Sequence, residues 1–497
     1  MIASADKIVT KALGEILRDL CDTGTSAGIN ITGLAIDSRQ IRAGYLFLAM
    51  PGSSADGRKY IDDAIKRGAA AVLYEHHKAQ IGKNYPVPVI ALNNLRDVAG
   101  KIADRFYDSP SQSLTVIGIT GTNGKTTCTQ LLTQTLSQSS KKCAVIGTLG
   151  CGFLGGLDET FHTTPDVVTV HKLLSEYRDA GAEYVCMEVS SHALAQGRVN
   201  EVEFDIAVFT NLSRDHLDYH GTMDVYGAAK ATLFGYDSLR YAVINHDDSF
   251  GRDLIATLGQ KKSSLVKVIS YGIDSGDVRA QQVMPRHDGL DMTVTTPMGE
   301  ATVRSHLFGR FNANNLLAVL AVLLVSDYSL QQAVERLSNV QPVAGRVEGF
   351  GGDAFPWVVV DYAHTPDALE QVLKALREHT QGQLWCVFGC GGNRDRGKRP
   401  QMGRLAEQLS DVVILTDDNP RHESSDDIIN DIVGGMTSRP EVIRPRERAI
   451  RFAVQQAAAD DIVLVAGKGH ETYQQIGDDR LPYSDRETVQ AILGEAA

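Results

Sequence analysis

Short, uninterrupted apolar runs recur along the middle of the chain, and helical patterns lie between several of them. The runs are LTVIGIT, CAVIGT, YVCMEV, FDIAVFTNL, YAVINH and LVKVISYG, between residues 114 and 272. Strands that stay apolar along their whole length are typical of a parallel sheet whose two faces are covered by helices. The pattern therefore predicts an α/β fold for this part of the chain.

Two polar segments divide the chain into three blocks. The first, DSPSQS, follows a helical pattern over residues 95–107, and the second, QPVAGRVEGF, starts at residue 341. A chain of 497 residues, at about 150 residues per domain, is expected to form roughly three domains. We predict three α/β domains, over residues 1–109, 110–343 and 344–497.

The charge and the cysteine content of the chain indicate which partners and which cellular compartment to expect. The chain carries 49 Lys and Arg against 61 Asp and Glu, a net charge of −12. An acidic surface repels phosphate backbones, so we expect no nucleic-acid partner and no anionic membrane partner. The seven cysteines form no CxxC pair, which favours free thiols in a reducing cytoplasm. We expect a cytoplasmic protein, because no secretory signal is visible and no apolar run approaches the roughly 20 residues of a membrane span.

Thr-Pro-Asp triplets stand before two predicted helices, at residues 164–166 and 365–367. Threonine can cap a helix and proline fits its first position. We therefore expect Thr164 and Thr365 to be the capping residues.

Three apolar runs of the last block end in glycine or polar residues. They are LWCVFGCGG, VVILTDDNP and DIVLVAGKGH. Ligands of an open parallel sheet sit outside the carboxyl ends of its strands, so these three ends predict a pocket.

A glycine-rich turn follows the first central strand and precedes a helix predicted from about Lys125. Its sequence, TGTNGKTT, is a variant of the phosphate-binding pattern GxxxxGK[ST], which would need glycine where Ile119 stands. Glycines let backbone N–H groups turn toward phosphate oxygens, and the helix N-terminus adds positive potential. Lys125 can reach the β- and γ-phosphates, and Thr126 can hold Mg²⁺. The predicted ATP loop is Gly121, Thr122, Asn123, Gly124, Lys125, Thr126 and Thr127.

A carboxylate, Glu188, closes the central strand YVCME. Such a strand should lie beside the phosphate loop, where a carboxylate is the usual second metal anchor. Taken alone, Glu188 fits a capped or solvated strand end equally well.

Seven motifs occur in the order found in one enzyme family: TGTNGKTT, MEVSSHAL, NLSRDHLDYHG, the AAK at 228–230, GRFNANN, VAGRVE and VVDYAHTPDAL. Over almost its whole length the chain thus resembles the Mur ligases, ATP-dependent amide-forming enzymes of peptidoglycan synthesis. LAIDSRQIRAGYLFLAMPG, HTTPD, DDNPR and GKGHE are similar to the branch that adds the third residue of the stem peptide. The resemblance implies a UDP-sugar-binding N-terminal domain, a central P-loop domain that binds ATP, a Rossmann-like C-terminal domain that binds the added amino acid, and a monomer.

The implied reaction activates the free side-chain carboxylate of D-glutamate in UDP-MurNAc-L-Ala-D-Glu as an acyl phosphate, which an amine then attacks. Two anions must approach each other, so cations are the main requirement. In the family, Mg²⁺ lies near the loop threonine and the strand-end glutamate, and a second Mg²⁺ bridges that glutamate, a histidine and a carbamylated lysine. The matching metal positions are Thr126, Glu188, His216 (with His220 as second choice) and Lys230, and the implied catalytic set is Lys125, Lys230, Glu188 and His216.

Residue type alone places Lys230 on an exposed helix face, because lysines are mostly exposed. Only the resemblance implies that it is buried at a metal site and carries a carboxylate from CO₂.

Other family positions carry over to the substrate contacts. Arg346 would reach ATP only if the domains close, so we expect a hinge at residues 342–346. The implied nucleotide contacts are Asn312, Arg346, Asp361 and His364. The implied contacts to the UDP-linked dipeptide are Ile36, Ser38, Ser53, Ser54, Ala55, His162, Thr163, Thr164, Ser190, Gln196 and Arg198.

The segment Asp418-Asn419-Pro420-Arg421 follows the strand VVILTD. Asn-Pro alone is typical of a turn, but the planar fork of Arg421 suits a carboxylate. meso-Diaminopimelate has a distal carboxylate that L-lysine lacks, and a buried arginine left without its anion would reject lysine. DNPR resembles the diaminopimelate-adding branch, which implies that Glu471 meets the distal ammonium. The implied amino-acid contacts are Arg394, Asp418, Asn419, Pro420, Arg421, Gly467 and Glu471.

Two other functions remain open. A folylpolyglutamate synthase shares the ATP chemistry but lacks the N-terminal UDP domain and DNPR. A P-loop switch would bind nucleotide and regulate a partner, and amino-acid-dependent ADP release would separate ligase from switch. A dinucleotide fingerprint in GCGGNR fails, because GxGxxG needs glycine where Arg394 stands.

Overall fold

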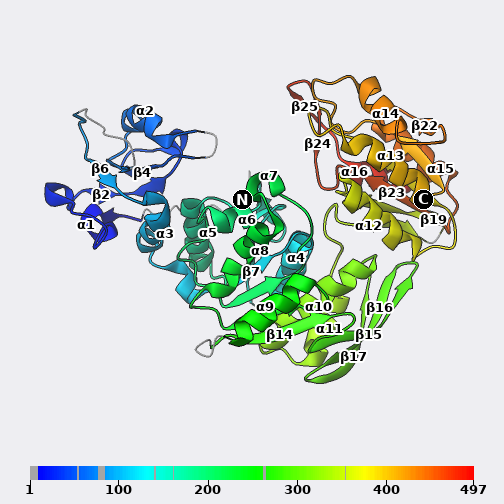
Figure 1. The fold of residues 1–497 in the computed structure, drawn as a ribbon, viewed down its shortest axis with the longest axis horizontal. Coiled ribbons are helices and arrows are strands. Elements are labelled where there is room, and N and C mark those ends of the chain that lie inside the picture. Colours follow the sequence, from blue (N-terminus) through cyan, green and yellow to red (C-terminus); the bar gives the residue numbers. More distant parts are fainter. Residues whose placement is uncertain are drawn as a thin grey trace. The chain divides into compact units, whose positions relative to one another are not determined.

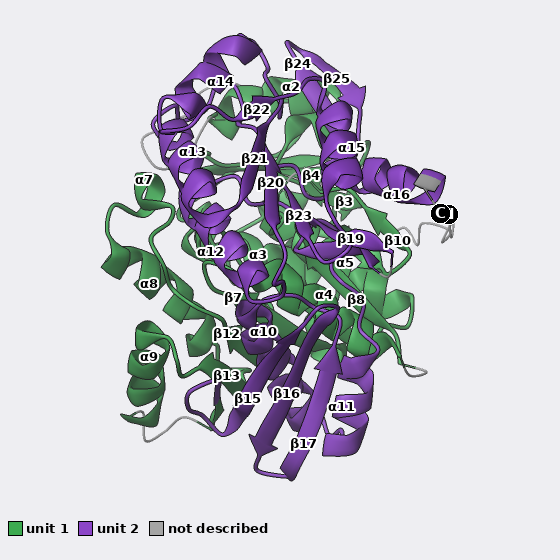
Figure 2. Cartoon of the chain, turned by 90° about the vertical axis from the view of Figure 1, so that its right-hand side faces the viewer, with its two compact units in different colours: residues 1–270 green, residues 271–497 purple. Residues whose placement is uncertain are grey.

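The computed structural model describes residues 9–52, 55–76, 84–138, 141–160, 162–260, 265–352 and 354–496 (Figure 1). The chain divides into two compact units, residues 1–270 and 271–497 (Figure 2). The predicted fold class is confirmed, because all three blocks of the chain contain a mainly parallel or mixed sheet with helices packed on it.

The N-terminal part of unit 1 is a four-stranded parallel sheet in the order β3-β4-β5-β6. Alternate side chains of β4 enter different cores: Leu46 packs with helix α3, and Phe47 packs with helix α2. Both faces of the sheet are thus covered. Its elements are β3 (Gly33–Ala35), β4 (Tyr45–Ala49), β5 (Ala71–Glu75), β6 (Val89–Leu92), α1 (Leu13–Ile16), α2 (Ile61–Lys66) and α3 (Leu95–Phe106), beside the ribbon β1 (Lys11–Ala12) and β2 (Asn30–Ile31).

The central sheet of unit 1 follows the order β10-β9-β8-β11-β7-β12-β13-β14. Strands β8, β11, β7, β12 and β13 are parallel neighbours, and β9 and β10 are antiparallel. Because β7 lies beside β11, with Ile119 opposite Glu188, the phosphate loop and Glu188 leave the sheet at the same edge. The strands are β7 (Thr115–Thr120), β8 (Cys143–Gly147), β9 (Gly150–Phe153), β10 (Gly156–Asp158), β11 (Tyr184–Glu188), β12 (Ile206–Phe209), β13 (Tyr241–Asn245) and β14 (Lys267–Gly272).

Helices cover both faces of this sheet. Val185 and Met187 of β11 share one buried cluster with Val170 and Leu174 of α5, and α4 packs on the neighbouring strands. The helices are α4 (Lys125–Ser137), α5 (Val167–Asp179), α6 (Ser191–Ala195), α7 (Leu217–His220), α8 (Met223–Ala231) and α9 (Ser249–Gln260).

One predicted helix cap is wrong. Helix α5 is capped by Asp166, whose carboxylate accepts hydrogen bonds from the backbone N–H groups of Val168 and Thr169. The hydroxyl of Thr164 instead donates to the carbonyl of Glu188 at 2.8 Å. The other expected cap is confirmed, since Thr365 accepts from Ala368 N at the start of α12, with proline at the first position.

Unit 2 begins with a three-stranded meander, β15 (Val278–Arg286), β16 (Gly289–Thr296) and β17 (Gly299–Ser305). A tight turn at residues 297–298 joins β16 and β17 as a hairpin. Two helices follow, α10 (Arg310–Val325) and α11 (Leu330–Ser338), and α10 packs on β15 while α11 packs on β17.

The rest of unit 2 is a six-stranded sheet in the order β18-β19-β23-β20-β21-β22, parallel except for β18. Cys386 of β20 faces a core with α12, whereas Val387 faces a core with α15, so helices cover both faces. The elements are β18 (Glu348–Gly352), β19 (Phe355–Asp361), β20 (Leu384–Phe388), β21 (Val412–Leu415), β22 (Glu441–Val442), β23 (Ile462–Ala466), α12 (Pro366–Arg377), α13 (Lys398–Leu409), α14 (Ser425–Val433), α15 (Arg446–Gln456) and α16 (Asp485–Ala496), with the hairpin β24 (Tyr473–Ile476) and β25 (Asp479–Pro482).

Two general expectations can be compared with the described residues. None of the seven cysteines, all of which lie in the described ranges, forms a disulfide, and all but Cys21 are buried. Over the ranges that the structure covers, none of the helices combines the length and the apolar character that crossing a bilayer requires.

Candidate functional site

The predicted phosphate loop lies between β7 and α4, as its sequence indicates. Gly121 and Gly124 both have positive φ, at 150° and 84°, conformations that glycine adopts without strain. Lys125 Nζ donates to the carbonyls of Gly121 and Thr122, each at 2.8 Å, so its ammonium lies over the loop. With the N-terminus of α4 at the same point, the loop concentrates positive potential suited to phosphate.

Gly121 has no room for a side chain. A Cβ there would collide with Thr210 Oγ1 and press on Asn211 N, in addition to the strain of its φ. We expect Gly121→Ala to destabilise the protein by about 1–3 kcal/mol and to weaken ATP binding, measured as the melting temperature and the KM for ATP. Gly259→Ala is the matched control, since a Cβ on that residue of α9 meets nothing within 4 Å. Equal melting temperatures for the two variants would contradict the steric argument.

Glu188 is a buried carboxylate at the edge of the loop, with 1% of its surface exposed. Its Oε2 accepts from Thr126 Oγ1 at 2.9 Å and from Thr148 Oγ1 at 3.2 Å, and its Oε1 accepts from Thr148 N at 2.7 Å. Among the described residues no lysine, arginine or histidine forms an ion pair with it. The predicted proximity of Thr126 and Glu188 is therefore observed. The negative charge of Glu188 is not balanced by a cationic side chain of the described residues, so it is suited to bind a metal cation.

Lys230 is buried, contrary to what its residue type suggests. Only 1% of it is exposed, and its Nζ donates to Gly121 O at 2.8 Å and lies 4.4 Å from the ring centre of Tyr226. Burial, reinforced by the nearby ammonium of Lys125, lowers the pKa of Lys230 to about 6. The amine is therefore largely neutral at pH 7, which is the form that reacts with CO₂.

The two candidate histidines differ in their surroundings. His216 is 44% exposed, lies 3.4 Å from Asp215 and is stacked edge-on with His192. His220 is buried, and its Nε2 lies 3.0 Å from Ser191 Oγ. Both rings lie within about 6 Å of the Tyr226 ring, so the histidines and Lys230 surround one aromatic side chain.

The oxygen-rich donor set fits Mg²⁺ better than a softer metal. No group of three or more His, Cys, Asp or Glu that could hold a metal occurs within the described ranges. Mg²⁺ is usually held by one or two carboxylates together with phosphate oxygens and water, so the Glu188 carboxylate and the Thr126 hydroxyl suffice as protein donors beside a nucleotide. A protonated Lys230 does not fit, whereas a carbamylated one does.

The residues expected to hold the peptide gather around Glu188. Thr163 Oγ1 lies 3.0 Å from Thr148 Oγ1, and Thr164 bonds to the carbonyl of Glu188. Arg198 Nη1 donates to Thr164 O at 2.9 Å. The other members are Ser190, which caps α6, and Gln196, whose Oε1 accepts from the Arg198 guanidinium.

The remaining UDP-dipeptide residues are not gathered in one cluster. Ser38 is buried at the start of a short 3₁₀ turn, Ile36 is half-buried, and Ala55 and His162 are exposed. Ser53 and Ser54 lie outside the described residues.

Three of the four nucleotide residues predicted in unit 2 lie near Tyr362. Arg346 stacks 4.9 Å from the Tyr362 ring centre, Asp361 accepts from Val347 N at 2.8 Å, and His364 Nδ1 donates to Tyr362 O at 2.7 Å. Burial raises the pKa of Asp361. The buried Arg346 Nε has no hydrogen-bond partner in the described part of the chain, so it is free to meet a ligand. Asn312 instead bonds locally: its Nδ2 donates to the carbonyl of Phe308, just before α10, and its Oδ1 accepts from Asn315 within the helix.

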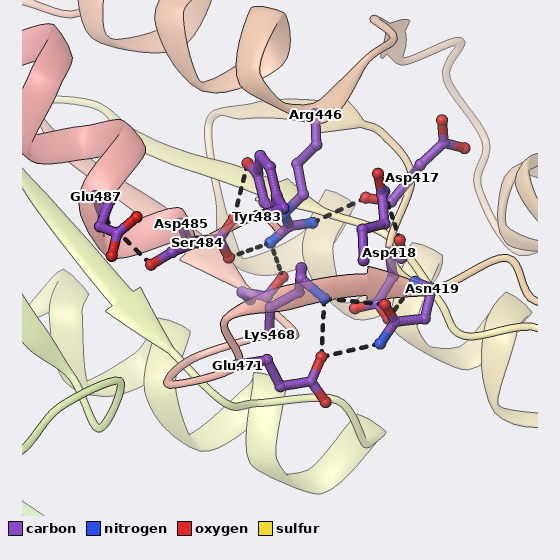
Figure 3. Close-up of polar contacts among 12 residues, drawn as sticks. Asp417, Asp418, Asn419, Arg446, Lys468, Glu471, Tyr483, Ser484, Asp485 and Glu487 are labelled. Carbon is purple, nitrogen blue, oxygen red and sulfur yellow. Dashed lines mark hydrogen bonds and ion pairs between the residues drawn. The ribbon is translucent and has the colours of Figure 1, made fainter. Parts of the chain in front are cut away.

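The carboxyl ends of β20, β21 and β23 lie at one edge of the sheet, as the sequence predicts. Lys468 Nζ donates to Asn419 Oδ1 at 3.0 Å and to Glu471 Oε2 at 2.8 Å, and Asn419 Nδ2 donates to Glu471 Oε2 at 2.9 Å (Figure 3). Gly467 has a φ of 118°, and a Cβ on it would lie 2.7 Å from Asp418 Oδ2. Asn419, Lys468 and Glu471, from two loops far apart in sequence, thus form one polar triangle. We call these two loops the acceptor subsite (Asp418, Asn419, Arg421, Lys468 and Glu471).

The arginines of this region are less enclosed than the sequence argument assumed. Arg421 is half-buried rather than buried, and its Nη1 already donates to Gly392 O at 2.9 Å. Arg394 is exposed, and Pro420 is buried. A short backbone pairing of Arg421 with Ile476 holds the DNPR segment beside the β24–β25 hairpin.

Beneath the acceptor subsite lies a buried ion pair that the sequence did not indicate. Arg446 and Asp485, 1% and 0% exposed, bond in a bidentate manner at 2.7 and 2.8 Å. Arg446 also donates to Asp417 O (Figure 3). A further bond runs from Arg446 to Ala466 O, so the guanidinium contacts the ends of both β21 and β23. Nothing in the sequence specifically singled out Tyr226, Thr148 or Lys468, although Thr148 ends the run CAVIGT and Lys468 lies in GKGHE.

Sequence models of one family match three segments of the chain. The Mur ligase family, catalytic domain, matches residues 30–107; the Mur ligase middle domain matches residues 119–323; and the Mur ligase, glutamate ligase domain, matches residues 345–469.

Individual relatives are similar over nearly the full length. The UDP-N-acetylmuramoyl-L-alanyl-D-glutamate--2,6-diaminopimelate ligase of Chromobacterium violaceum is 51% identical over 94% of this chain and 95% of its own. The protein of that name from Coxiella burnetii is 49% identical over 97% and 99%. A solved structure of a UDP-N-acetylmuramoyl-L-alanyl-D-glutamate--2,6-diaminopimelate ligase matches with a TM-score of 0.74 and 36% identity, over 98% of this chain and 99% of that one.

Proposed function

This chain belongs to the Mur ligase family, and from that premise we propose that it joins meso-2,6-diaminopimelate to UDP-MurNAc-L-Ala-D-Glu at the expense of ATP. The full-length similarity to ligases of that name supports the substrate assignment. The structural observation that carries it is the acceptor subsite, where hydrogen bonds between charged and polar side chains join the DNPR and GKGHE segments.

The reaction has two steps on the substrates. The free carboxylate of D-glutamate attacks the γ-phosphorus of ATP, which gives an acyl phosphate and ADP. The amine of the amino acid then attacks the acyl carbon, loses a proton and expels phosphate through a tetrahedral intermediate. The loop amides and Lys125 hold the phosphates, and Thr164, Ser190 and Arg198 orient the peptide beside Glu188.

We assign Mg²⁺ to Glu188 and Thr126, with His216 and carbamylated Lys230 as the further ligands. When bound, the ion neutralises phosphate oxygens so that a carboxylate can approach them. Lys230 takes up CO₂ as a neutral amine, which its burial next to Lys125 favours.

In the acceptor subsite we assign the distal carboxylate of the amino acid to Arg421 and its distal ammonium to Glu471. Asn419 fixes Glu471 by a hydrogen bond of 2.9 Å. Asp418, Pro420, Gly467 and Arg394 complete the assigned contacts. Arg346, Asp361, His364 and Asn312 complete the nucleotide contacts, with residues 342–346 as a hinge.

The three substrates are small molecules, and we propose a monomer that works in the cytoplasm, where its seven thiols, none of them in a disulfide, stay reduced. A folylpolyglutamate synthase activity is disfavoured by the N-terminal sheet and by the acceptor subsite. A nucleotide switch is disfavoured by the substrate residues grouped around Glu188.

One assay tests this function. We expect ATP hydrolysis to ADP and phosphate only when the UDP-dipeptide is present, and turnover to require meso-diaminopimelate. L-lysine, L-glutamate with a folate acceptor, and no amino acid serve as the comparison reactions. Nucleotide hydrolysis independent of any amino acid would favour the switch, and turnover with folate would favour the synthase.

A further inference from the structure

Lys468 is a buried cation in the acceptor subsite with no role in the proposed reaction so far. Its side chain is fully buried, and its ammonium touches two residues assigned to the amino acid, Asn419 and Glu471 (Figure 3). One oxygen of Glu471, Oε2, receives hydrogen bonds from both Lys468 and Asn419. The other, Oε1, receives none from the described residues and is the one left for a ligand.

The ion pair between Lys468 and Glu471 determines how strongly Glu471 can attract a cationic group of the substrate. A carboxylate already balanced by a buried ammonium attracts a second cation weakly, unless that cation brings its own anion. The distal centre of meso-diaminopimelate is a zwitterion, with its carboxylate assigned to Arg421. The side chain of L-lysine would instead bring a positive charge near Lys468 without a carboxylate of its own.

We propose that Lys468 is a specificity-determining residue: by neutralising Glu471, it makes the subsite select an amino acid with a zwitterionic distal end over one with a cationic end. The inference rests on the proposed function and names how that site discriminates. Lys468 acts through Glu471 and is therefore a positioning residue.

Lys468 is not needed to hold the strand ends together, because the neighbouring Arg446 of the Arg446–Asp485 ion pair already does so. Arg446 already bonds to Asp417 O and Ala466 O, which ties together the ends of β21 and β23. Gln475 N also donates to Asn419 Oδ1 at 2.9 Å, so Asn419 keeps a partner when Lys468 is replaced.

The test compares amino-acid selectivity in the full-length enzyme. Lys468→Met removes the charge at similar length, Lys468→Gln removes it but keeps a donor, and Lys468→Arg keeps it. For each, kcat/KM is measured with meso-diaminopimelate and with L-lysine. We expect the ratio of the two to fall by about tenfold or more in Lys468→Met and Lys468→Gln, and to stay near that of the unaltered enzyme in Lys468→Arg.

Arg480→Met is the matched control. Arg480 and Lys468 lie over the same Tyr473 ring, at 4.6 and 5.6 Å, but Arg480 is exposed and has no bond to Glu471. We expect its selectivity to be unchanged.

Each other outcome counts against the inference. Equal losses with both amino acids, or failure of both neutral variants to fold while Lys468→Arg folds, would assign Lys468 to stability alone. If the unaltered enzyme does not use meso-diaminopimelate, the proposed function itself fails; if it does and the ratio does not move, only the role of Lys468 fails.

Discussion

Lys230→Ala is expected to lower kcat by about a thousandfold or more, and millimolar acetate or formate to restore part of the activity. The reason is the chemistry of a buried neutral amine. Its lone pair adds to the carbon of CO₂, a proton leaves, and the resulting carbamate offers the oxygen that the metal site needs. An added carboxylate can occupy the space of the missing group.

Because CO₂ reacts only with the neutral amine, enzyme activity is expected to depend on pH. The pKa of Lys230 is lowered to about 6, so the reactive neutral form is lost as the pH falls through that value. We expect activity in limiting CO₂ to fall with it. Full activity of Lys230→Ala without added carboxylate would contradict the assignment.

Stability provides the control that separates lost chemistry from lost folding. The pKa of Lys230 is lower in the folded chain than in the unfolded one, so the unfolded state binds more protons between about pH 6 and its ordinary value of 10.5. The stability cost of burying the amine is therefore complete below about pH 6 and disappears as the pH rises toward 10.5. In CO₂-free buffer, Lys230→Met should be inactive yet melt at a higher temperature at pH 7, by an amount that shrinks as the pH rises. Gly121 O keeps the Lys125 hydrogen bond in this variant.

Arg421→Ala is expected to reduce kcat/KM for meso-diaminopimelate by about a hundredfold to a thousandfold, while kcat/KM for L-lysine changes little. The planar guanidinium is assigned to the carboxylate that only meso-diaminopimelate carries. Because Arg421 is half-buried and shares one nitrogen with Gly392 O, the loss should be smaller than for a fully desolvated pair.

Two variants sharpen this measurement. Arg421→Lys keeps the charge but loses the fork, and should recover only part of the affinity. His422→Ala alters the adjacent exposed residue, which bonds to Asp478, and should leave both rates unchanged. Equal losses with both amino acids in Arg421→Ala would show that the residue does not read the distal carboxylate.

Local patterns predicted the parts of the site that local structure creates. A strand, a glycine turn and a helix form within 23 residues, so the loop over residues 121–127 could be predicted from its own sequence. The position of Glu188 beside Thr126 followed because neighbouring parallel strands end at one edge. The cap at Thr164 was wrong because its hydroxyl bonds instead to a carbonyl 24 residues away, which no local pattern reveals.

Burial of charged groups was the part that sequence could not supply. Lys230 lies in a short helix of ordinary composition, and its burial depends on Gly121, 109 positions earlier. Lys468 is fixed by Asn419, 49 positions away, and Arg446 by Asp485, 39 positions away. These contacts arise only when β20, β21 and β23 are packed side by side, and the resemblance to a family reached Lys230 but not the other two.

Through the ion pair of Arg446 with Asp485, the last helix supports the acceptor subsite, although none of its residues is assigned to the ligand. Asp485 is the first residue of α16, and its partner Arg446 steadies the carbonyls beneath the acceptor subsite. A chimera that carries the acceptor subsite into another family member therefore has to include helix α16 as well. A graft that stops before residue 485 would leave the buried Arg446 guanidinium without its carboxylate partner. We expect such a chimera to show altered amino-acid selectivity, although every residue assigned to the ligand would be present.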